Sequence, residues 1–419
     1  MKYMEYPAVC DSFWQDTLSC GTVLRVIPRK GFAKTYAFYA LNYGSIDTKF
    51  SLDGKTYTTP GGVAHYLEHK MFDMPYGDAM NRFAELGGNP NAFTSHTMTA
   101  YYVECTEHLQ ENLQVLLEFV NTPYFTQSSV DKERGIIGQE IRMYHDSADS
   151  RVYDNLFDAM YHVHPVKVPI AGTEESIAGI TPEILELCHK AFYATSNAML
   201  CVMGDVEPEE IRELAERFLP AVKMSRGIAD YGREPMTCLQ SRVEDTMEVA
   251  MPTFVVGFKD TPPSSGFDAI KREFTGDLAA DLLLSASAPL YTRLYEEGLI
   301  ESSFSAGYES LKGMCLFSAG GDSKDPDAVV EAILKEAEHA AVDKALFARL
   351  KKASLGRKLR EMDSFESTCF RSAAYFFEGA EYFDSVAALQ TVTEDDVEAY
   401  IRTVIRPENA CVSVIRPQN

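Results

Sequence analysis

A polar cap followed by an amphipathic segment and an apolar run occurs twice along the chain. The first copy begins at Thr181, with Pro182 beside it, and leads into the apolar run 199–203. The second begins at Thr393 and leads into the run 411–414. In both, an Asn-Ala turn comes sixteen residues after the threonine. Threonine is a good helix N-cap and proline suits the first helical position, so each copy predicts a helix, a turn and a strand.

The spacing of these copies indicates an internal repeat. They lie 212 positions apart in a chain of 419 residues, and a second pair of apolar strands, 35–42 and 253–258, supports the repeat. Chance similarity of two short segments is the alternative. We predict two similar modules, residues 1–222 and 244–419, joined by a polar linker at 223–243. Because strands and helices alternate irregularly, the expected fold class is α+β, with a largely antiparallel sheet packed with helices in each module.

Apolar side chains at helical spacing predict four further helices. These cover residues 109–120, 129–144, 207–219 and 325–340. Two glycines inside the segment 129–144 weaken its pattern, because glycine disfavours the interior of a helix.

Charge excludes several classes of protein. The chain has 62 acidic and 39 basic residues, a net charge of −23, and so acidic a surface disfavours binding to nucleic acid or to an anionic membrane. The acidity fits a preference for basic substrates, and it fits a need for solubility equally well. No apolar stretch is long enough to span a membrane.

The cysteines and the N-terminus indicate a compartment. Nine cysteines, an odd number without a C-x-x-C pair, fit a reducing compartment with mostly buried thiols. Residues 1–6 lack the apolar run of a signal peptide. We therefore expect a cytoplasmic protein.

One short motif carries metal chemistry. His65 and His69 are four residues apart, so on a helix both imidazoles project from one face and can share a zinc ion. Glu68 lies on nearly the same face, where a carboxylate can take a proton from water activated by the metal. The order H-x-x-E-H is a metallopeptidase signature. Two histidines on a solvated helix face are the alternative.

A catalytic zinc site needs a third protein ligand, and the segment 130–140 offers one. Glu133 and Glu140 are seven residues apart, which places both carboxylates on one helical face. One can bind the metal while the other orients a ligand or a substrate amine. Taken alone, both fit surface carboxylates of an acidic protein better.

Together these motifs resemble those of the insulinase/pitrilysin family of zinc metallopeptidases. The resemblance implies that His65, His69 and Glu140 bind Zn2+. It also implies that Glu68 is the catalytic general base and that Glu133 is a supporting catalytic residue. Family members of this length form half of a clamshell from two similar modules, and the second module here has no metal site.

Further segments resemble the same family over essentially the whole chain. Asn91, Ala92, Phe93 and Thr94 are similar to the family's active-site strand, whose edge binds an extended substrate peptide as an added strand. A plain turn into a core strand is the alternative for these four residues. Other similar segments are 164–165 and 171–177, and those at 30–36, 43–47 and 135–141 resemble the YmfH-like bacterial subgroup.

The second module departs from the family pattern. At the 212-residue offset, the two histidine positions hold Asp277 and Asp281. Many relatives carry an arginine and a tyrosine in this module that bind the substrate backbone. By alignment, Tyr295 and Glu301 hold those positions here, and Arg293 lies one turn away. This difference leaves the role of these three residues open and speaks against autonomous substrate binding.

The sequence therefore predicts a zinc metalloendopeptidase, a hydrolase of peptides or small unfolded polypeptides. The missing arginine–tyrosine pair favours a heterodimer with a related zinc-less subunit, with a homodimer as the alternative. A competing hypothesis is an inactive or weakly active structural or processing subunit of a peptidase-like complex. A peptide-binding module that acts beside another enzyme is a third. The natural substrate and the cleavage specificity stay open.

Overall fold

The computed structural model describes residues 1–221, 225–263 and 265–418. The end of the first expected module and the start of the expected linker, 222–224, lie outside the described residues, as do positions 264 and 419 of the second module. The chain divides into two compact units. Unit 1 comprises Met1–Ile141, Pro169–Asp230 and Glu361–Phe377, and unit 2 comprises Arg142–Val168, Tyr231–Arg360 and Glu378–Asn419.

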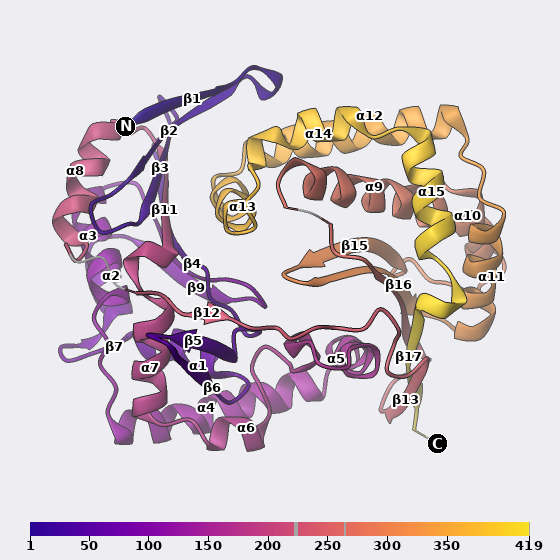
Figure 1. The fold of residues 1–419 in the computed structure, drawn as a ribbon, viewed down its shortest axis with the longest axis horizontal. Helices are drawn as coiled ribbons and strands as arrows, with labels where there is room; N and C mark the ends of the chain where they lie inside the picture. The colour runs from indigo at the N-terminus through magenta and orange to yellow at the C-terminus, as the bar shows by residue number, and fades with distance from the viewer. Residues whose placement is uncertain (222–224, 264, 419) are drawn as a thin grey trace. The chain divides into compact units, whose positions relative to one another are not determined.

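Unit 1 is built on a seven-stranded sheet (Figure 1). In spatial order its strands are β1 (Lys2–Tyr6), β2 (Asp11–Thr17), β3 (Val23–Pro28), β11 (Ala198–Gly204), β4 (Thr35–Leu41), β10 (Thr99–Cys105) and β9 (Asn89–Thr94). Neighbours are antiparallel except β3 and β11, which are parallel. Smaller sheets contain β12 (Ile228–Ala229), β5 (Lys49–Leu52) and β6 (Lys55–Thr58), and β7 (Asp73–Met74) with β8 (Gly77–Asp78). Strand β9 therefore forms an edge of the main sheet.

Unit 2 contains a five-stranded sheet. In spatial order its strands are β13 (Arg242–Met247), β17 (Ala410–Pro417), β14 (Thr253–Asp260), β16 (Met314–Asp322) and β15 (Ser305–Leu311). Only the pair β13 and β17 is parallel. This order matches β3-β11-β4-β10-β9 of unit 1 strand by strand and in direction. The predicted repeat of two similar modules and the α+β fold class are confirmed.

The helices are divided between the two halves of the chain. The first half holds α1 (Val63–Met71), α2 (Ala79–Glu85), α3 (Leu109–Val120), α4 (Gln127–His145), α5 (Ala148–Met160), α6 (Glu174–Ala178), α7 (Pro182–Phe192) and α8 (Pro208–Phe218). The second holds α9 (Phe267–Leu284), α10 (Pro289–Glu296), α11 (Pro326–Glu338), α12 (Lys344–Glu361), α13 (Phe365–Phe377), α14 (Ser385–Thr391) and α15 (Glu394–Val404). Among the described residues, no helix is both long and apolar enough to cross a membrane.

The predicted helices lie close to their expected bounds. The side chains of Thr181 and Thr393 cap α7 and α15 by accepting hydrogen bonds from main-chain N–H groups in the first turn. Helix α4 is continuous through its two glycines, because one of them, Gly138, is buried together with Val130 and Ile137 on the packed face. Tertiary packing thus outweighs the low helix propensity of glycine there.

Two helices pack on the sheet that belongs to the opposite half of the sequence. Helix α5 contacts β14 and β17 in unit 2, and α13 contacts the equivalent strands β4 and β11 in unit 1. Gly257 on β14 makes room for α5, since a Cβ added there would lie 2.7 Å from Met160 Cε. The compact units are therefore discontinuous, whereas the expected modules 1–222 and 244–419 are contiguous.

Helices cover both faces of the unit 1 sheet. Helix α1 contacts β9 and β10 on one face. On the other face, the Phe93 ring of β9 lies 5.6 Å from the Phe370 ring of α13. Edge strand β9 is thus held between α1, which carries the histidine motif, and the exchanged helix α13.

Candidate metal centre

A glycine pair fixes the start of α1. Gly62 has a φ of +86°, and a Cβ added there would lie 2.4 Å from the Ala171 carbonyl oxygen. The Ser176 hydroxyl donates to the Gly61 carbonyl oxygen at 2.8 Å. The segment 171–177, which the sequence singled out without a role, therefore anchors the helix that carries both histidines.

Alanine at position 62 is expected to destabilise the chain by about 2 kcal/mol or more, from left-handed strain and a main-chain clash. Gly54→Ala is the matched control, because Gly54 has a φ of +78° with nothing within 4 Å of an added Cβ. Urea unfolding of both variants measures the difference. A Gly62→Ala loss no larger than that of Gly54→Ala would contradict close packing against Ala171.

Two polar contacts hold α1 against the start of α4. The Tyr66 hydroxyl donates a short hydrogen bond to the Val130 carbonyl oxygen. The buried Lys70 ammonium donates to the Ser129 carbonyl oxygen at 3.4 Å and pairs with Asp73. These contacts fix the spacing between the helix that bears the histidines and the helix that bears the glutamates.

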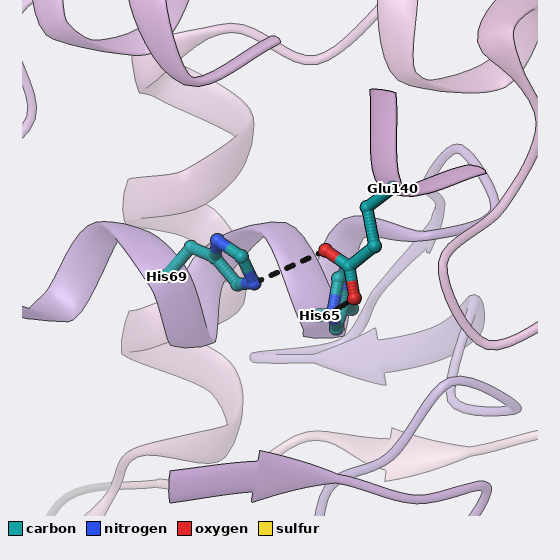
Figure 2. A group of neighbouring side chains, drawn as sticks. All are labelled: His65, His69 and Glu140. Carbon is teal, nitrogen blue, oxygen red and sulfur yellow. Dashed lines mark ion pairs between the residues drawn. The ribbon is translucent and has the colours of Figure 1, made fainter. Parts of the chain in front are cut away.

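The predicted metal ligands meet between these two helices (Figure 2). His65 Nε2 lies 3.4 Å from Glu140 Oε1, and His69 Nε2 lies 3.6 Å from Glu140 Oε2. The two imidazole rings are 4.6 Å apart. Among the described residues, this is the only group of three His, Cys, Asp or Glu side chains whose ligand atoms lie within 4.8 Å of one another.

These separations fit one tetrahedral ion. Zinc bound to nitrogen and oxygen at about 2.1 Å separates neighbouring ligand atoms by roughly 3.4 Å in a tetrahedron, which matches the two nitrogen–oxygen distances. The same distances are long for direct hydrogen bonds. Two imidazoles and one carboxylate are also a ligand set that leaves a fourth position open.

Glu133 sets the orientation of one candidate ligand. Its Oε1 lies 3.0 Å from His69 Nδ1, so His69 donates from Nδ1 and keeps the Nε2 lone pair directed at the site. Burial lowers the pKa of His69, but the Glu133 hydrogen bond and the nearby Glu68 and Glu140 outweigh it, so the pKa is raised overall. The two glutamates, seven residues apart on α4, therefore contact different atoms. Glu133 contacts His69 Nδ1, whereas Glu140 lies near the Nε2 atoms of both histidines.

Glu68 lies beside the three candidate ligands and is buried. Burial raises the pKa of its carboxyl group, although His65 and the hydrogen bond from Thr94 oppose this. The Thr94 hydroxyl donates to Glu68 Oε2 at 2.8 Å. Thr94 is the last residue of edge strand β9, so this hydrogen bond joins the end of that strand to Glu68, and substrate binding by residues 91–94 stays a prediction.

Unit 2 has two carboxyl groups and one ion pair at the equivalent place. Asp281 accepts a hydrogen bond from Arg357 Nη2 at 2.7 Å. Burial and the neighbouring Glu273 raise the pKa of Asp277 to about 7, although Lys358 opposes this. Both acidic side chains are on α9, the helix equivalent to α1, and the basic side chains of Arg357 and Lys358 are on α12.

Three residues stand at or near the positions where many relatives carry the arginine and the tyrosine, and each has different surroundings. Arg293 Nη2 lies 3.7 Å from Glu336 Oε2. Tyr295 is exposed and stacks on Tyr291, and Glu301 is exposed. None of these contacts indicates a role in holding a peptide.

Comparison with known proteins places the chain. Its residues 54–174 match the family model of insulinase (peptidase family M16), and residues 179–354 match that of the peptidase M16 inactive domain. The zinc protease YmfH of Bacillus subtilis (strain 168) is 35% identical over 436 residues, with 100% of each chain covered. The chain belongs to the insulinase family of peptidases. The predicted resemblance to this family and to its YmfH-like subgroup is confirmed.

Solved structures agree with this M16 membership. An M16-like peptidase from Alicyclobacillus acidocaldarius superposes with a TM-score of 0.93 at 34% identity, covering 99% of this chain and 100% of that one. A protease from Helicobacter pylori shares the fold, with a TM-score of 0.84 at 19% identity over 97% of this chain and 100% of the other. The M16 inactive-domain match includes Asp277 and Asp281, where the histidine motif is absent.

Sequence reasoning missed three contacts that build the site. These are Thr94 with Glu68, Gly62 with Ala171, and Tyr66 with Val130. The Gly61–Gly62 pair before the motif was a signal of close main-chain approach. The other two contacts join residues 26 and 64 positions apart, and no local pattern indicates them.

Proposed function

We propose that this M16 family member is a zinc endopeptidase that hydrolyses peptides or small unfolded polypeptides. The observation that carries the proposal is the convergence of α1 and α4, which brings His65, His69 and Glu140 to separations suited to one zinc ion. Glu68 lies beside them. Histidines that merely face solvent have no reason to meet a carboxylate from a second helix at these distances.

In this proposal each side chain has one task. His65, His69 and Glu140 hold the zinc, which when bound supplies Lewis-acid chemistry that activates water and polarises the scissile carbonyl. Glu68 accepts the proton from water and returns it to the leaving amine. Glu133 keeps His69 in the tautomer whose Nε2 can bind the metal. The raised pKa of Glu68 suits a group that must take up and then release a proton.

We further propose that the substrate binds as an added strand on β9. The edge position of β9 and its contact with α1 support this. Asn91, Ala92, Phe93 and Thr94 would form the binding edge, with main-chain hydrogen bonds supplying most of the affinity. Such an edge suits short extended chains better than folded proteins.

Metal removal tests the proposal. Elemental analysis should find about one zinc per chain, and internally quenched peptides of about nine residues should be cleaved. Treatment with 1,10-phenanthroline should stop cleavage, and added zinc should restore it, because all three ligands remain in the apo chain. Cleavage that persists without metal, or a purified chain that never binds zinc, would contradict the proposal.

We also propose that a related zinc-less subunit completes the active enzyme as a heterodimer. The substitutions at Tyr295 and Glu301 support this, because the chain lacks the arginine–tyrosine pair that the family resemblance implies. Light scattering during size-exclusion chromatography measures the oligomeric state, and the peptide assay on each peak measures the activity of that state. Full activity in a homodimer of this chain alone would remove the need for a second kind of subunit.

A structural or processing subunit with little activity is the second candidate function. The same departures at Arg293, Tyr295 and Glu301 favour it, whereas the assembled zinc ligands speak against it. Bound zinc without cleavage of any peptide, alone or with candidate partners, would support this alternative.

The cysteines support a cytoplasmic location for this activity. All nine are free thiols, and seven of them are buried. Free thiols persist in reducing compartments.

A further inference from the structure

We infer that Thr94 is a positioning residue that orients Glu68, and that it couples strand docking on β9 to the proposed general base. This inference rests on the proposed peptidase function. It assigns the Thr94 side chain a task different from contact with the substrate, which the sequence predicted for residues 91–94 as a group.

The direction of the hydrogen bond follows from neighbouring hydroxyl groups. The Thr94 hydroxyl lies 2.8 Å from Glu68 Oε2 and 3.5 Å from the Thr99 hydroxyl. The Thr99 hydroxyl donates its own proton to the Tyr43 carbonyl oxygen at 2.9 Å. Because a carboxylate only accepts, the Thr94 proton is directed at Glu68.

This hydrogen bond leaves one carboxylate oxygen for chemistry. Among the described residues, the Thr94 hydroxyl is the only hydrogen-bond partner of the Glu68 side chain. Oε2 is therefore held, and Oε1 is available to take a proton. The Thr94 side chain is β-branched, so its χ1 angle has few alternatives and the hydroxyl direction is well defined.

The main chain of Thr94 faces the open edge of β9. Hydrogen-bonded and non-hydrogen-bonded pairs alternate along an antiparallel ladder. Ser95 N donates to Met98 O at 2.8 Å, so the next pair, Thr94 with Thr99, is the non-hydrogen-bonded kind. Ala92 fits this alternation, since its N–H donates to the Asn91 side chain at 2.8 Å instead of to β10.

The main chain and the side chain of Thr94 therefore face different partners. The Thr94 N–H and C=O point outward, where an added strand would bind, and its hydroxyl points to Glu68. A peptide that pairs with the edge as far as Thr94 would be held at the strand end that carries the base. Strand pairing by β9 needs only its main chain. The hydrogen bond to Glu68 gives a reason for a hydroxyl side chain at the last position of this strand.

Removal of the hydroxyl tests the inference. Thr94→Val keeps the β-branched shape and should lower kcat for the internally quenched peptides by about 10–100-fold, because the base loses its orientation. KM should stay within about twofold, since the main chain still binds the peptide. Thr94→Ser should recover kcat to within about threefold of the original chain. Thr58→Val, an exposed threonine on edge strand β6, is the matched control and should change neither constant.

Two readouts do not depend on turnover. Zinc content should be the same in all four proteins. Crystal structures should show the Glu68 carboxylate displaced in Thr94→Val and retained in Thr94→Ser. An unmoved carboxylate, an unchanged kcat, or an effect confined to KM would overturn the inference. If the original chain neither binds zinc nor cleaves peptides, the proposed function fails, and the Glu68 position in the variant structures still decides the positioning role.

Discussion

Replacement of Glu68 by glutamine is expected to lower kcat for peptide cleavage by about 10²–10⁴-fold, the usual range for loss of a general base. Glutamine has nearly the same shape, and its side-chain oxygen can still accept the Thr94 hydrogen bond that Glu68 accepts at 2.8 Å. It has no lone pair basic enough to take a proton from water. Steady-state kinetics with internally quenched peptides measures kcat, and elemental analysis measures the zinc content.

Zinc content separates this role from metal binding. Glu68 is not one of the three converging ligands, so Glu68→Gln should keep about one zinc per chain. Glu85→Gln is the matched control, because Glu85 is exposed on α2, and it should leave kcat unchanged. Zinc loss from Glu68→Gln would make Glu68 a ligand, and unchanged cleavage would place the base elsewhere.

The sequence could predict the parts of this site that depend on helical spacing. The interval between His65 and His69 places both rings on one side of α1, whatever the helix packs against. The interval between Glu133 and Glu140 does the same for α4. Which glutamate lies near the Nε2 atoms depends on how α4 is rotated against α1, and the contacts of Tyr66 and Lys70 help to fix that packing. The family resemblance supplied the assignment that spacing left open.

The exchange of α5 and α13 could not be predicted in this way. An amphipathic pattern shows that a helix buries one face, but it does not indicate which sheet receives that face. Five strands of the unit 1 sheet have the same order as the whole unit 2 sheet, so the two sheets offer equivalent surfaces to either helix. Contiguous modules are the simplest interpretation of such a repeat, and the structure departs from it at these two helices.

The expected linker illustrates a different limit. The stretch 223–243 is polar and weakly patterned, and that composition predicted a linker between the two modules. In the structure β12 pairs with β5 of unit 1, and β13 begins at Arg242. Between them, Glu234 makes a dense set of polar contacts within unit 2. A polar stretch can thus be tightly held when its side chains satisfy buried groups.

Glu234→Ala is expected to destabilise the chain by about 3–5 kcal/mol, because it removes one partner of a buried ion pair. Glu234 Oε1 accepts a hydrogen bond from Lys259 Nζ at 2.6 Å, and the Lys259 side chain is only 2% exposed. The same carboxylate accepts main-chain hydrogen bonds from His162, Val163 and His164 at 2.8–2.9 Å. Alanine would leave a buried ammonium group and three N–H groups short of an acceptor.

Urea unfolding followed by circular dichroism measures this loss, and hydrogen–deuterium exchange locates it. Exchange should rise in β14, which carries Lys259, and in the turn after α5. Glu331→Ala is the control, because Glu331 is exposed on α11, and it should change stability by less than about 0.5 kcal/mol. Equal effects of the two substitutions would show that the buried pair contributes little.

The ion pair also sets the direction of a pH dependence. Burial opposes ionisation of Glu234, but Lys259 and the three main-chain donors outweigh it and depress its pKa to about 2 from an ordinary 4.5. The stabilisation is therefore fully present above pH 4.5 and is lost as the pH falls toward 2. The difference in unfolding free energy between the original chain and Glu234→Ala should stay constant from about pH 7 to 5.5 and shrink below about 4.5. A difference that instead grew on acidification would mean that the carboxylate is not held by these donors.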